Sequence, residues 1–179
     1  MPVLASWIPV DAALNVLIPL GLVSTPTGGL VIDLDRAGPA VGPGPTLAQL
    51  VNDGPTAEQL RFTSGRRGYL SNGGVDVAAA SNVIEAFVER WPRVVLKCPA
   101  AGPRPEGAVA FLPLLPSPFT PTSPDPCVYQ RSALSPSGRA DSVVLPIPRR
   151  GTVSALMKGA QPSGRDRWLS ALGRMWLRE

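Results

Sequence analysis

Residues Gly29–Asp35 read GLVIDLD, a nearly unbroken aliphatic run that ends in two aspartates. Apolar runs of this kind are typical of strands that are buried on both faces, which occur in parallel sheets covered by helices. The carboxyl ends of such strands form the crevice in which open α/β sheets bind their ligands. The run therefore predicts a central parallel strand at Gly29–Leu34, with Asp33 and Asp35 at its functional end.

On both sides of this strand, short apolar runs alternate with segments of helical periodicity. Further strands are predicted at Val3–Ile8, at Tyr69 and Leu70, and at Arg93–Cys98, Val109–Leu115 and Ser142–Ile147. Helices are predicted at Asp11–Val23, Thr46–Asn52, Asp76–Trp91, Thr152–Gly159 and Arg165–Arg178. The alternation predicts an α/β fold, an open, mostly parallel, Rossmann-like sheet with helices on both faces, in one domain over residues 1–179.

Composition narrows the classes of function. The chain has 179 residues, 44% of them hydrophobic and 17% charged, and it contains no histidine. Ser-His-Asp and Cys-His nucleophiles and His-containing zinc sites are therefore excluded. Cys98 and Cys127 fit neither a disulfide framework nor a thiolate metal site and are interpreted as core residues. Apolar runs are too short to span a membrane and the first residues lack a basic signal region, so a cytoplasmic protein is expected.

The 22 prolines gather in two places, at Gly38–Pro45 and at residues 99–126, and the second is predicted to be a proline-rich loop that begins with a buried strand. Basic charge gathers in residues 131–179, which hold nine Lys or Arg against three Asp or Glu. An anionic partner would bind there, and the candidate surface is Arg149, Arg150, Arg167, Arg174 and Arg178. Nucleic acid is the weaker alternative for this partner and would use Arg131 and Arg139 with Arg149 and Arg150. The simplest explanation of the many arginines is a compositional bias of the sequence.

The last predicted helix is amphipathic. Trp168, Leu172, Met175 and Trp176 share one face, and arginines lie opposite. Such a helix suits an anionic membrane surface, which would place the protein at the inner face of the membrane. It equally suits a final helix that covers one face of the sheet, and the core role is favoured.

The order of landmarks resembles the MinD/ParA family of deviant Walker ATPases. The matching segments are the strand that ends in Asp33 and Asp35, the following TLAQLV helix, the RVVLKCP strand, and the late segment VLPIPRRGTVSALMKGAQP. The resemblance implies a P-loop NTPase-like topology, a magnesium-linked aspartate on the RVVLKCP strand and a membrane-targeting helix at the end of the chain.

The departures from the family concern its chemistry. The phosphate-binding loop, which needs glycines, a lysine and Ser or Thr, should precede the first helix, but the sequence there is Pro9-Val10-Asp11-Ala12-Ala13. The position of the magnesium-linked aspartate is held by Lys97 or Cys98. Asp33 and Asp35 then form a vestigial site whose carboxylates cap the following turn, although they could also orient water or magnesium. Gly73-Gly74 is interpreted as a turn. We expect a pseudo-ATPase without cofactor or metal.

Two classes of function remain open. The first is a non-catalytic MinD/ParA-like adaptor that binds a protein partner, as a homo- or hetero-oligomer, in a cell-division, DNA-partition or pilus or secretion apparatus. The second is a small Rossmann-like enzyme or nucleotide-binding protein with an unrecognised site. The absence of histidine and of a Gly-Lys loop favours the adaptor.

Overall fold

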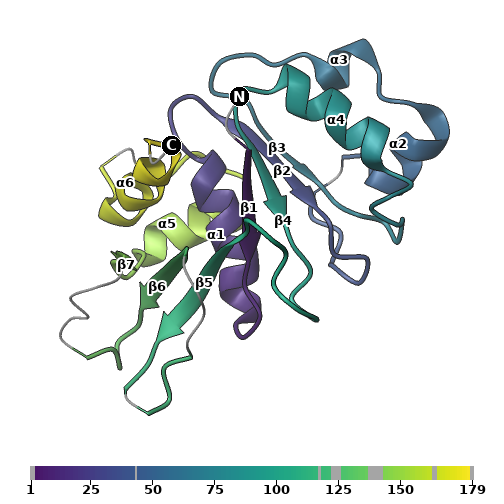
Figure 1. The fold of residues 1–179 in the computed structure, drawn as a ribbon. Coiled ribbons are helices and arrows are strands. Elements are labelled where there is room, and N and C mark those ends of the chain that lie inside the picture. The colour runs from purple at the N-terminus through teal and green to yellow at the C-terminus, as the bar shows by residue number, and fades with distance from the viewer. Residues whose placement is uncertain are drawn as a thin grey trace.

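The computed structural model describes residues 3–42, 44–116, 118–121, 126–136, 143–162 and 165–177. Its centre is an all-parallel seven-stranded sheet with the order β3-β2-β4-β1-β5-β6-β7 (Figure 1). The strands are β1 (Val3–Trp7), β2 (Gly29–Asp33), β3 (Arg67–Leu70), β4 (Val94–Lys97), β5 (Val109–Leu114), β6 (Cys127–Arg131) and β7 (Val143–Leu145). The α/β prediction is confirmed, and GLVID forms a strand in which every residue is buried.

Helices lie on both faces of the sheet. They are α1 (Ala12–Val23), α2 (Leu47–Asp53), α3 (Ala57–Leu60), α4 (Ser81–Arg90), α5 (Arg150–Met157) and α6 (Arg167–Gly173), which continues as a 3₁₀ turn at Arg174–Leu177. Helices α1, α5 and α6 pack on one face, and α2, α3 and α4 lie on the other (Figure 1). The alternation of side chains along β2 explains this arrangement, because Val31 packs with α1 while Leu30 and Ile32 pack with α2 and α4.

The strand predicted at Val109–Leu115, within the proline-rich segment 99–126, is confirmed, because Val109–Leu114 forms β5 inside the sheet. Pro113 is tolerated there because β5 pairs with β1 only as far as Ala110. The Ala110 amide donates toward β6, to the Pro126 carbonyl at 3.0 Å. By alternation, the nitrogen of Pro113 faces the side where β1 has ended, so no ladder hydrogen bond is lost.

Three elements differ from the sequence prediction, and the first is α3, a short helix at Ala57–Leu60 that is not among the predicted helices. Strand β6 was not predicted, since CVYQR is short, partly polar and preceded by prolines. Helix α4 begins at Ser81 rather than at Asp76, because the Asp76 carboxylate accepts the N–H of Ala78 and forms a turn of its own. Val77, which falls inside the predicted helix Asp76–Trp91, consequently lies before α4 and is 39% exposed.

Candidate functional site

The carboxyl end of the sheet holds a buried ion pair between Asp33 and Lys97. The two residues are register partners on β2 and β4, so their side chains leave the same face of the sheet. The Lys97 Nζ lies 2.9 Å from both carboxylate oxygens of Asp33. The side chains of Lys97 and Asp33 are 1% and 0% exposed. Charges this deeply buried require a partner, and each of these two residues neutralises the other.

Three further groups close around the Asp33 carboxylate. The Tyr69 hydroxyl donates to Oδ2 at 2.8 Å, and the backbone N–H of Asp35 donates to Oδ1 at 2.9 Å. Gly38 packs against the same carboxylate so closely that a Cβ there would lie 2.7 Å from Oδ2. The space around Asp33 is therefore filled by a lysine, a tyrosine and the backbone of the following turn.

Burial and the negative charge of Asp33 raise the pKa of Tyr69. The hydroxyl therefore stays protonated at physiological pH and serves as a donor to Asp33 rather than as a base. Asp35 remains outside the buried cluster, and its carboxylate accepts the N–H of Ala37 at 3.0 Å. Both aspartates thus have the turn-capping bonds that the sequence favours. Asp33 has two more partners, Tyr69 and Lys97, that the sequence did not predict.

The start of α1 is closed by its own N-cap. Asp11 follows directly after the short segment that leaves β1, and its carboxylate accepts the N–H groups of Ala13 and Leu14 at 2.9 Å each. A phosphate-binding loop presents such N–H groups to a ligand. Here the chain's own carboxylate occupies them and also places a negative charge where a phosphate would bind.

Four arginines of the predicted anionic-partner surface, Arg149, Arg150, Arg167 and Arg174, are described and exposed, but they do not all lie at one helix end. Arg149 and Arg150 begin α5, and Arg167 begins α6. A hydrogen bond from the Thr152 hydroxyl to the carboxylate of Asp166 joins the starts of these two helices. Arg174 lies apart from these helix starts, because it is at the opposite end of α6 from Arg167. Arg178 and Arg139 lie outside the described residues.

The apolar face of the C-terminal helix is packed into the core. Trp168 and Leu172 are 1% and 0% exposed, and Trp176 is 7% exposed. The indole N–H of Trp168 donates to the Gln130 side chain at 2.7 Å, and that of Trp176 donates to the Leu22 carbonyl at 3.0 Å. Met175 is half-buried against the same cluster. These residues cover the sheet, which is the core role that the sequence favours.

Large exposed apolar side chains follow the carboxyl ends of four neighbouring strands. Val10, Phe119, Leu134 and Ile147 are 56%, 73%, 74% and 54% exposed, and they follow β1, β5, β6 and β7. Because the sheet is parallel, these segments leave from the same edge. We call these four residues the carboxyl-edge apolar set.

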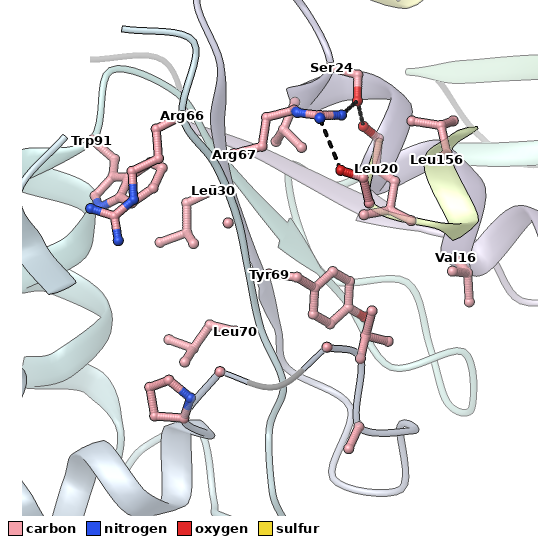
Figure 2. Close-up of a pocket in the computed structure, with 18 of the residues that line it drawn as sticks. Val16, Leu20, Ser24, Leu30, Arg66, Arg67, Tyr69, Leu70, Trp91 and Leu156 are labelled. Atoms are coloured by element: carbon pink, nitrogen blue, oxygen red, sulfur yellow. Dashed lines mark hydrogen bonds between the residues drawn. The ribbon is translucent and has the colours of Figure 1, made fainter. Parts of the chain in front are cut away.

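A cavity of about 810 Å³ lies along β3, the terminal strand at one lateral edge of the sheet (Figure 2). Residues from α1, from the turn after α5, from the loop after β2 (residues 39–42, 44 and 45) and Trp91 line it. The sequence did not predict this cavity, because the residues that form it are brought together from distant segments and share no motif.

The described residues contain no group of three His, Cys, Asp or Glu side chains that could hold a metal ion. They also contain no helix with the length and apolarity needed to cross a membrane. A scan against models of known protein families finds no match to this chain, and a search of curated proteins finds no relative.

Proposed function

We propose that this protein is a non-catalytic MinD/ParA-like adaptor, a pseudo-ATPase that binds a protein partner in a cell-division, DNA-partition or pilus or secretion apparatus. The observation that carries the proposal is the Asp33–Lys97 ion pair. The resemblance implies a magnesium-linked aspartate on the strand that ends at Lys97. An ammonium group stands there instead and neutralises the carboxylate of the neighbouring strand, so an internal cation takes the position that a metal would need.

The phosphate side of the site supports the same conclusion. The N–H groups at the start of α1 are bound by Asp11, the Lys97 ammonium is bound to Asp33, and Lys158 follows the end of α5. Phosphoryl transfer depends on positioned cations and backbone donors around the phosphates. These residues do not fit magnesium-ATP.

The carboxyl-edge apolar set supports the binding of a partner. Contiguous exposed apolar patches are typical of surfaces that bind proteins, membranes or ligands. In this sheet the four residues of the set lie at the edge where open α/β sheets bind their ligands. If this edge does not bind a nucleotide, it can bind a protein partner instead.

The proposal is tested by titrating the purified protein with magnesium-ATP in a calorimeter. We expect no saturable heat and no ATP hydrolysis, because the site lacks a phosphate cradle and an accessible metal ligand. The Asp11→Ala variant is the matched control, since it frees the N–H groups of α1 but still lacks the lysine and the metal site, and it should also remain silent. Saturable binding in the micromolar range by the wild-type protein would refute the pseudo-ATPase proposal.

The second candidate function is a small-molecule enzyme or nucleotide-binding protein, and the cavity along β3 favours it. Its volume of about 810 Å³ falls in the range of ligand sites. Tyr69 is the one residue of the Asp33 cluster that lines it. The Tyr69 hydroxyl donates its single proton to Asp33, so towards a ligand its oxygen could only accept a hydrogen bond.

A further inference from the structure

Strand β3 is the terminal strand of the sheet, and no strand of the described residues pairs with its outer side. In a parallel ladder, successive residues direct their backbone N–H and C=O groups to opposite sides of the strand. The Arg66 carbonyl accepts the N–H of Gly29 at 3.0 Å, which sets the alternation. Arg67 and Tyr69 therefore present their backbone groups outward, where no strand of the described chain pairs with them.

The cavity lies along this open side. All residues from Arg66 to Leu70 line it, together with Leu20 from α1 and, across the strand, Trp91. In Figure 2, the Tyr69 side chain lies on the same side of the strand as Leu20, while Leu70 and Trp91 lie on the opposite side. A cavity that touches both faces of one strand must follow its edge. It offers backbone donors and acceptors at its centre and an apolar hollow on each side.

The charge around the cavity is positive. Arg66, Arg67 and Lys158 line it, and no described Asp or Glu does. Neither guanidinium forms an ion pair with a described residue, since Arg67 donates to the carbonyls of Gly159 and Ala160 and Arg66 donates to backbone carbonyls and lies over the Trp91 ring at 5.3 Å. An occupant with acidic side chains would supply the missing negative charge.

We propose that the open edge of β3 binds an extended, acidic peptide segment of another protein by strand addition. Backbone groups of the peptide would pair with Arg67 and Tyr69, and its alternate side chains would enter the two hollows. A second copy of this chain fits less well, because edge-to-edge pairing would bring two sets of Arg66, Arg67 and Lys158 together without a carboxylate between them. The proposal rests on the sheet edge and not on the loss of nucleotide chemistry.

The test starts from a phage-displayed library of random peptides of about twelve residues, which exceeds the ~13 Å span of a four-residue strand. We expect the selected peptides to alternate apolar residues and to carry Asp or Glu. Fluorescein-labelled copies should bind Arg67→Pro about tenfold more weakly than wild type, because proline removes the outward N–H without breaking a bond to β2.

Arg67→Thr is the matched control, since it also lacks the guanidinium but keeps the N–H, and it should bind within about threefold of wild type. Lys158→Glu, at an exposed position, should weaken binding without touching the backbone. If Arg67→Pro does not fold, amide hydrogen exchange of the wild type replaces it, and the Arg67 and Tyr69 amides should gain protection on peptide binding. The proposal is overturned if no peptide is enriched, if the peptides bind Arg67→Pro as tightly as wild type, or if these amides stay unprotected.

Discussion

At the residue scale, the buried pair of Lys97 and Asp33 shows how one side chain can change the chemistry of a strand end. An open carboxylate at this position is a ligand for metal or water. Once Lys97 lies 2.9 Å from both of its oxygens, the carboxylate becomes part of the interior. The carboxylate also accepts hydrogen bonds from the Tyr69 hydroxyl and from the Asp35 amide. These donors take the place of the water that burial excludes from its oxygens.

Replacing Lys97 by methionine should destabilise the protein by about 3–5 kcal/mol, because the Asp33 carboxylate then remains buried without its counter-charge. The free energy of unfolding in urea measures the effect. The double variant Asp33→Leu/Lys97→Met removes both charges and should recover most of the loss. A single variant as stable as wild type would show that the pair is not buried in solution.

The sequence predicts where Asp33 lies but not what it binds. The aliphatic run before Asp33 places this residue at a strand end, and its spacing to Asp35 predicts the turn. Lys97 is 64 residues further along the chain. The two meet only because β4 inserts beside β2 in a register that no local pattern specifies. Tyr69 joins them for the same reason, from the opposite neighbouring strand.

At the scale of the element, the contacts of the C-terminal helix distinguish a role in membrane binding from a role in the protein core. Its amphipathic pattern is the same in both cases, because a lipid surface and a sheet face select the same apolar stripe. The difference lies in the indole N–H groups, each of which bonds inside the protein, to Gln130 and to Leu22. A membrane-bound helix would leave both acceptors buried and unpaired.

Trp168→Ala should lower the free energy of unfolding by about 3–5 kcal/mol, through the cavity it leaves in the core. Leu177→Ala is the matched control, since Leu177 is 77% exposed on the turn that follows the same helix and should have little effect. Chemical denaturation measures both. In parallel, the intact protein should stay in the supernatant when anionic liposomes are sedimented. Sedimentation with the liposomes, together with an unchanged stability of Trp168→Ala, would contradict the core role and support membrane binding by this helix.

Elements were predictable where a single physical signal dominates. The aliphatic run of β2 and the Thr46 cap of α2 each depend on local sequence, and the structure has both. Strand β6 was missed because its place in the sheet depends on pairing with β5 and β7, which its own short sequence does not indicate. The start of α4 was placed too early because an aspartate suits a turn as well as it suits a helix cap.

At the scale of the whole molecule, the parallel sheet gives the protein one chemically distinct edge. Every strand ends there, and the carboxyl-edge apolar set follows four adjacent strands of it. The open edge of β3 lies at one lateral limit of the same sheet. A partner protein that binds at the carboxyl edge and a peptide that binds at β3 would therefore occupy separate surfaces.

Affinity capture from a lysate of the source organism tests the carboxyl edge. We expect a partner, or self-association in light scattering, that is lost when Leu134 and Ile147 are both changed to Asp, because two charges cannot be buried in an apolar interface. Leu177→Asp is the matched control and should retain the partner. A strict monomer at high concentration, with no captured partner, would contradict the adaptor function.

The junction at the middle of the sheet has a consequence for how the protein unfolds. Strands β1 and β5 share only two register pairs, so the β3-β2-β4-β1 half and the β5-β6-β7 half are joined by a short ladder. The C-terminal helix spans this junction, since Trp176 bonds to Leu22 in α1 and Trp168 bonds to Gln130 in β6. This last helix therefore couples the two halves into one cooperative unit, and amides of β6 and β7 would exchange in a separate, lower-energy opening once it is released.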